Sequence, residues 1–208
     1  MRASTWVYRW VAALAIFGAV IVPLLQVQPA KAFKPYTHTK IGDQAYEDVV
    51  ADGKVTIDGV DYSVPTEVYE ALRDYPQFYR GGTIGPDGFP DIVYGQGVIH
   101  PATTGEWMRY VYDQAWAAQT NTTAYPTLAE GRQILAFAYG YLTHAAGDMW
   151  AHTFVNEFAE GVFPAVGEVL TEVDKAAIAL RHIIVEGYLG DATAGFDGNS
   201  DQGSIGED

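Results

Sequence analysis

Apolar residues recur with helical spacing through much of the chain. This spacing predicts helices over residues 41–50, 66–73 and 106–119. Thr127 and Glu130 form a capping box after Pro126, which predicts the start of a long helix that runs to about Phe158. A further helix is predicted over 171–189, with Gly190 as its C-terminal cap.

Strand-like spacing is confined to residues 51–65. Two short β-type runs flank Asp58-Gly59, a dipeptide that favours a tight turn, so a small β-hairpin is predicted near 54–64. Residues 80–104 are rich in glycine and proline and read as a loop. No internal repeat is evident. The predicted fold class is therefore all-α, with one small hairpin.

The N-terminus has the pattern of a signal peptide over residues 1–32. Arg2 and Arg9 precede an apolar run over 11–25, and Ala30-Lys31-Ala32 forms a cleavage site that would leave Phe33 as the new N-terminus. An uncleaved membrane anchor is the alternative, but the run is short for a bilayer span. The sequence thus predicts a secreted protein, extracellular or periplasmic, with a domain over 33–190 and a flexible Gly/Asp-rich tail over 191–208.

The composition limits which metal ligands and which substrates the protein can have. Hydrophobic residues make up 49% of the chain, which is enough for a core, and there is no cysteine. Disulfides and thiolate metal sites are therefore excluded. Cleavage after Ala32 would leave nine basic residues against 26 acidic ones, a net charge of −17. Such a charge repels phosphate backbones and anionic membranes, so polynucleotide substrates are disfavoured.

Histidines and acids occur at helical spacing in two places. His144, Asp148 and His152 lie at i, i+4 and i+8, within roughly 80° on one helix face. His182 and Glu186 repeat the i, i+4 spacing. Imidazole and carboxylate are the ligands that zinc accepts where sulfur is absent. Each pair could instead be an ordinary ion pair, but two pairs in one small domain favour a metal site.

Two further sets of residues lie near these positions. Gly140 and Gly147 both lower helix propensity, which close approach of another backbone would explain; tight helix packing without a metal is the alternative. Four aromatic residues could line an apolar cleft beside the metals or belong to the core: Trp107, Tyr110, Trp150 and Phe154.

Four segments in order along the chain carry a family resemblance: residues 37–41 (THTKI), 85–87 (GPD), 144–148 (HAAGD) and 182–186 (HIIVE). Together they resemble the zinc-dependent phospholipase C superfamily, which also includes secreted single-strand-specific nucleases. The resemblance extends from Phe33 to about Glu186. It implies an all-helical, phospholipase C-like bundle around a trinuclear zinc site.

The resemblance also implies a ligand set for up to three zinc ions. The first ion would be held by Asp87, His100, His144 and Asp148; the second by Asp148, His38 and the amine and carbonyl of Phe33; the third by His152, His182 and Glu186. Asp91 is an alternative to Asp87, although the Gly-Pro-Asp context favours Asp87. Well-studied members place the last histidine of the long helix six residues after the aspartate, whereas His152 follows Asp148 by four.

The expected function is therefore a secreted zinc-dependent phosphodiester hydrolase, in which Asp87 could act as a base while bound to zinc. A phospholipid or small phosphodiester is the expected substrate, with transient contact to a membrane surface. A single-strand-specific nuclease on the same scaffold is one alternative, and a non-catalytic metal-binding domain is another. No stable protein partner is evident from the sequence.

Overall fold

The computed structural model describes residues 35–87, 104–121, 126–164 and 166–193. These segments are mostly helical, as predicted, and carry one small two-stranded sheet. The helices are α2 (Pro35–Asp52), α3 (Thr66–Asp74), α4 (Pro76–Ile84), α6 (Thr104–Gln119), α7 (Leu128–Ala159), α8 (Val166–Thr171) and α9 (Val173–Ala192). None of the helices in these segments has the length and apolarity needed to cross a bilayer.

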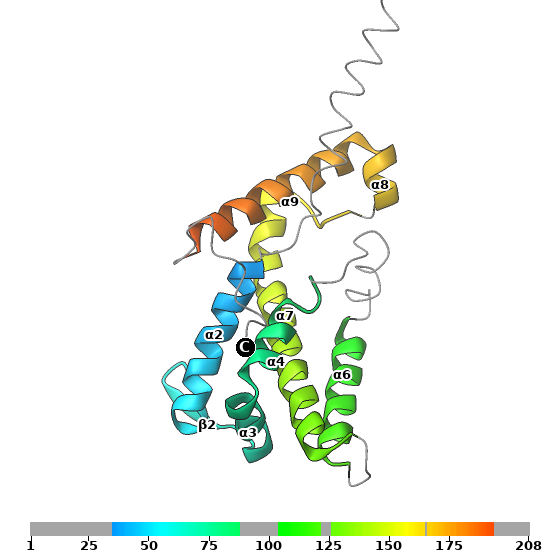
Figure 1. Ribbon diagram of the computed structural model, residues 1–208. Helices are drawn as coiled ribbons and strands as arrows, with labels where there is room; N and C mark the ends of the chain where they lie inside the picture. The colour runs from blue at the N-terminus through cyan, green and yellow to red at the C-terminus, as the bar shows by residue number, and fades with distance from the viewer. Residues whose placement is uncertain (1–34, 88–103, 122–125, 165, 194–208) are drawn as a thin grey trace, which may run out of the picture. The chain divides into compact units, whose positions relative to one another are not determined.

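Helix α7 is the element on which most of the others pack. Helices α3, α4 and α6 contact it, and α9 lies against its C-terminal part (Figure 1). Its start matches the prediction. The Thr127 hydroxyl accepts a hydrogen bond from the backbone N–H of Glu130, and the Glu130 carboxylate accepts one from the backbone N–H of Thr127. The main buried cluster lies around the N-terminal half of α7: Val49, Val68, Ala71, Leu72, Tyr79, Ala115, Leu135, Ala136 and Ala138.

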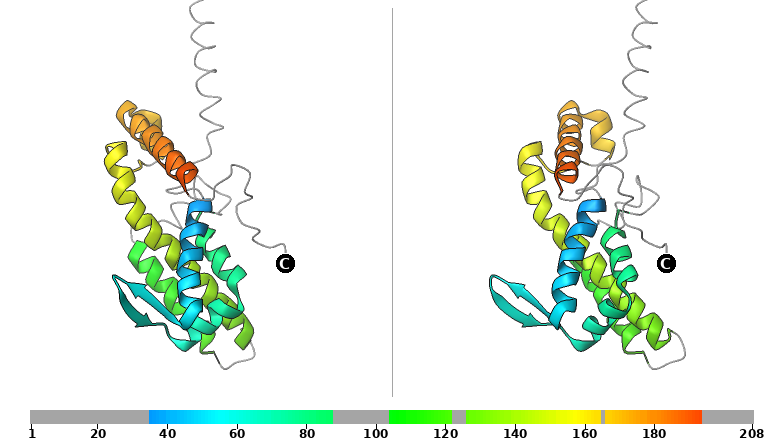
Figure 2. Two further views of the ribbon diagram at one scale, coloured as in Figure 1. Left: turned by 90° about the vertical axis from the view of Figure 1, so that its left-hand side faces the viewer. Right: turned by 60° about the vertical axis from the view of Figure 1, so that its left-hand side comes forward.

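The hairpin is also confirmed. Strand β1 (Lys54–Ile57) pairs antiparallel with β2 (Val60–Ser63), and Asp58 and Gly59 both have positive φ angles at the turn. The hairpin follows α2 directly, and β1 packs against that helix (Figure 2). Its strands are largely exposed, so it contributes little to the core.

Several predicted boundaries are wrong. Helix α2 (Pro35–Asp52) already includes the described residues ahead of the predicted start at residue 41. Residues 80–84 are helical rather than loop, since they form the end of α4. Residues 88–103, most of the predicted loop, lie outside the described residues, as do the predicted signal peptide and residues 194–208 of the tail.

The prediction for residues 171–190 also needs correction. Thr171 ends α8, and Glu172 has an extended backbone (φ −125°, ψ 116°) that redirects the chain so that α8 packs against α9. Gly190 is not a cap but a buried residue inside α9. The helix continues to Ala192, and the Thr193 hydroxyl donates to the Leu189 carbonyl at 2.9 Å.

Close packing of α4 on α7 depends on glycine. A Cβ on Gly82 would overlap the carbonyl oxygen of Phe137, and one on Gly140 would overlap that of Tyr79. The prediction of close backbone approach is therefore confirmed at Gly140. It is wrong at Gly147, where the neighbour is the ring of His38 and a Cβ would lie 3.6 Å from Nδ1, an ordinary contact.

We predict that Gly82→Ala and Gly81→Ala differ sharply, although they change neighbouring residues of one helix. Gly82→Ala should destabilise the fold by about 1–3 kcal/mol or more, because two backbones must separate. Gly81→Ala should be neutral or stabilising by up to about 1 kcal/mol, since its Cβ would lie 3.9 Å from the Phe137 ring. Urea unfolding measures both, and equal stabilities would contradict the packing described.

Candidate metal site

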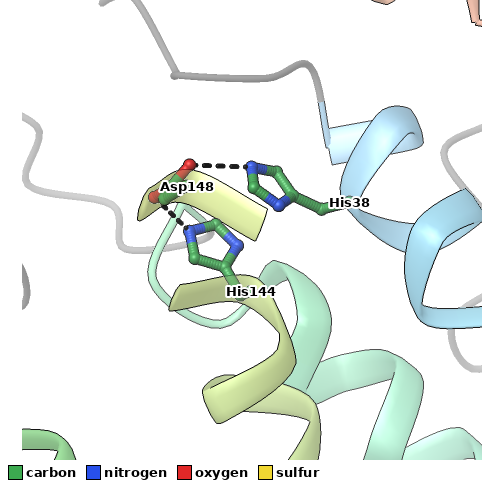
Figure 3. Close-up of side chains that lie close together, drawn as sticks. All are labelled: His38, His144 and Asp148. Carbon is green, nitrogen blue, oxygen red and sulfur yellow. Dashed lines mark ion pairs between the residues drawn. The ribbon is translucent and has the colours of Figure 1, made fainter. Parts of the chain in front are cut away.

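The first group of candidate ligands joins α2 to α7. His38 and His144 are buried, and their rings stack with centroids 3.8 Å apart. The carboxylate of Asp148 lies beside both rings: Oδ1 is 3.3 Å from His38 Nε2, and Oδ2 is 3.0 Å from His144 Nε2 (Figure 3). The three side chains could therefore each contribute one ligand atom to the same metal ion.

Asp87 extends this group. It is buried just after α4, and its Oδ2 lies 3.8 Å from His38 Nε2. Of the two aspartates considered from the sequence, Asp87 is placed beside the other candidate ligands, whereas Asp91 lies outside the described residues. His100 and Phe33 also lie outside them, so their predicted roles stay predictions.

The second group joins α7 to α9. It comprises His152, His182 and Glu186, which together could hold a metal ion. His182 and Glu186 are buried, and His152 is partly buried. His182 Nδ1 lies 3.4 Å from Glu186 Oε1, and the His152 and His182 rings have centroids 6.1 Å apart. The i, i+4 spacing seen in the sequence thus places both α9 residues on one buried face.

Backbone carbonyls orient two of the imidazoles. His144 Nδ1 is 2.8 Å from the Thr83 carbonyl oxygen, and His182 Nε2 is 2.6 Å from that of Gly161. A carbonyl can only accept, so each of these ring nitrogens carries the proton and donates it. The other nitrogen of each ring faces a carboxylate. Metal-binding histidines typically donate their second N–H in this way.

A carboxylate facing a ring nitrogen that carries a lone pair needs a cation between the two atoms. Without a metal, a proton can supply it. Burial lowers the pKa of His144, but its hydrogen bond and charge interaction with Asp148, together with the charge of Asp87, outweigh burial and raise the net pKa. By contrast, burial is the dominant effect on His38 and lowers its pKa.

The pKa of Glu186 is strongly raised. Burial, followed by the negative charges of Asp148 and Asp87, raises its pKa to about 9. Glu186 therefore keeps its proton at neutral pH unless a cation replaces it. Asp148 and Asp87 belong to the first ligand group and Glu186 to the second. The two groups are therefore close enough for the carboxylates of the first to raise the pKa of an acid in the second.

Some features of the site could not be found from the sequence. The two orienting carbonyls belong to Thr83 and Gly161, and backbone groups leave no residue-type signal. Asn156 lies one turn after His152, and its side-chain oxygen is buried without a hydrogen-bond partner among the described residues.

The sequence alternative that placed the aromatics in the core is wrong for Tyr110, Trp150 and Phe154, which are exposed.

We predict that Glu186 makes the metal-free protein less stable as pH rises. Its carboxyl ionises near 4.5 when unfolded but only near 9 when folded, so stability is lost progressively between these values. Glu186→Gln should remove this loss and stabilise the metal-free protein at the alkaline end of the interval. Urea unfolding in the presence of a chelator, with the exposed Glu67→Gln as control, tests this; an unchanged pH dependence would contradict it.

No family model matches this chain, and comparison with curated proteins and with solved structures also found no match.

Proposed function

We propose that this chain is a secreted zinc-dependent phosphodiester hydrolase of the phospholipase C-like type. The observation that supports this most strongly is the pair of buried histidine–carboxylate groups carried by α2, α7 and α9. In each group a backbone carbonyl fixes one imidazole so that its other nitrogen faces a carboxylate. Two adjacent groups of this kind suit hydrolysis at more than one metal ion.

The residues present fit zinc by their chemistry. Imidazole nitrogens and carboxylate oxygens are both ligands that Zn²⁺ binds, and the chain offers no thiolate that would favour a purely structural cysteine site. The buried carboxylates of Asp87, Asp148 and Glu186 would be costly to ionise without a nearby positive charge. Zinc would supply that charge and displace the protons held at His144 and Glu186.

In the proposed mechanism, zinc held by the two ligand groups would supply a water of lowered pKa and a Lewis acid for a phosphoryl oxygen. Asp148 holds the first group together, since its two oxygens face His38 and His144 separately. The Thr83 carbonyl keeps the His144 ring in one tautomer. Asp87, whose Oδ2 lies 3.8 Å from His38 Nε2, would accept a proton from the attacking water.

Charge and exposed aromatics support a lipid or small ester as the substrate. The whole chain has a net charge of −14, which repels polynucleotides over long range. Trp150 and Phe154 are 75% and 43% exposed on α7, the helix that also carries His144, Asp148 and His152. They offer apolar surface on the helix that carries three of the proposed ligands, which suits acyl chains better than bases.

We predict that the purified protein contains up to three zinc ions. His144→Ala and Asp148→Ala should each lose at least one ion and reduce activity at least about a hundredfold, because each removes a proposed ligand. Asp43→Ala is the matched control, since Asp43 lies on α2 but pairs with Arg80 instead of the histidines. Elemental analysis decides: folded, active wild-type protein without a transition metal would refute the proposal.

We also predict that phosphatidylcholine or a chromogenic phosphodiester is cleaved faster than single-stranded DNA. Trp150→Ser should slow hydrolysis of phosphatidylcholine vesicles by about tenfold, the effect expected from removing one large apolar contact, and leave the soluble ester unaffected. Tyr62→Ser, on the exposed hairpin, serves as control. Faster cleavage of single-stranded DNA than of either ester would favour the nuclease alternative.

A further inference from the structure

Asn156, on α7, has a side-chain oxygen whose bonding the fold does not explain. This atom, Oδ1, is buried and has no hydrogen-bond partner among the described residues. On α9, Glu186 Oε2 is also buried without such a partner. The two oxygens do not bond to each other. Because leaving a buried acceptor unpaired is costly, an atom of this kind normally has a donor or a cation beside it.

Backbone hydrogen bonds place Asn156 beside the second ligand group. Its carbonyl accepts from the backbone N–H of Gly161 at 3.0 Å, and the Gly161 carbonyl accepts in turn from His182 Nε2. Along α7, Asn156 lies between His152 and Ala159, which is buried and whose carbonyl accepts a hydrogen bond from α9. At 100° per residue these three α7 residues fall within about 60° of one another. Asn156 therefore lies on the side of α7 that meets α9.

We propose that Asn156 Oδ1 is a fourth protein ligand of the metal ion held by the second ligand group, an inference that rests on the proposed function. Each helix then supplies two ligands at i and i+4, the spacing at which side chains of one helix lie close enough to share an ion. These pairs are His152 with Asn156 on α7 and His182 with Glu186 on α9. An ion held by both pairs joins the two helices.

A neutral ligand suits this position. Amide oxygens bind divalent cations, as carboxylate oxygens do, but they add no charge. The charges of Asp148 and Asp87 already act on Glu186, so a further carboxylate here would increase the repulsion in the metal-free protein. Zinc can also accept a fifth ligand during a reaction, so four protein ligands are compatible with the proposed hydrolysis.

The affinity for zinc tests the proposal directly. Purified protein is stripped of metal and titrated with Zn²⁺ against a competing chelator. Asn156→Leu should weaken the binding of one ion by about tenfold to a hundredfold and leave the others unchanged. Asn156→Asp keeps an oxygen at this place and should bind that ion at least about tenfold more tightly than Asn156→Leu. Glu157→Gln, at the next and exposed residue of α7, is the control and should bind zinc as the wild type does.

Urea unfolding separates a ligand from a residue that only packs between α7 and α9. In a chelator, Asn156→Leu should unfold at the same urea concentration as the wild type or at a higher one, because it removes an unpaired buried acceptor. With saturating zinc the order should reverse, because the ion stabilises the folded state according to its affinity. If Asn156→Leu lowers the helical circular dichroism, Asn156→Ala takes its place with the same expected results.

The possible failures of this ligand and of the proposed function are distinguishable. Zinc binding by Asn156→Leu as tight as that of the wild type would overturn the ligand alone. So would equal affinities of Asn156→Leu and Asn156→Asp, or a loss of stability in Asn156→Leu that is the same with and without zinc. Folded wild-type protein that binds no zinc would overturn both the ligand and the proposed function.

Discussion

The candidate site depends on the close approach of α2, α4 and α7, which glycine allows. Gly82 and Gly140 bring α4 and α7 together, and Gly42 lets α2 approach Thr83. The Tyr79 hydroxyl donates to the Gly42 carbonyl and closes the same junction. Candidate ligands lie about one turn away: His38 precedes Gly42 by four residues, and His144 follows Gly140 by four. Larger residues at these glycines would separate the helices and, with them, the imidazoles and the Thr83 carbonyl.

Buried acids impose the second constraint. Asp87, Asp148 and Glu186 are all largely removed from solvent, yet they lie close enough to influence one another electrostatically. The chain compensates partly through His144, whose pKa is raised by Asp148 and Asp87, and partly by keeping a proton on Glu186. Apolar residues at these positions would carry no such desolvation cost. A cluster of three buried acids is therefore best explained by a cation that replaces the protons.

How much the sequence could predict follows from the range of each interaction. The capping box at Thr127, the turn at Asp58-Gly59 and the i, i+4 pairs are local, and each was found where the pattern placed it. The junction of His38 with Asp148 spans 110 residues and came only from a family resemblance. The Thr83 and Gly161 carbonyls left no signal at all. The prediction of Gly190 as a cap is wrong because a glycine required for packing and one required for a left-handed turn look the same in a sequence.

The continuity of α7 explains why the histidine after Asp148 comes at residue 152. Asp148 belongs to the first ligand group and His152 to the second, yet both lie on one unbroken helix. Four residues return the side chain to nearly the same face, about 6 Å further along, whereas six residues would rotate it by about 240°. A spacing of six therefore requires some distortion of the helix, while a spacing of four requires none. In this chain the helical rise of α7 sets the distance between Asp148 of the first group and His152 of the second. The position of α9 then determines how His182 and Glu186 meet His152.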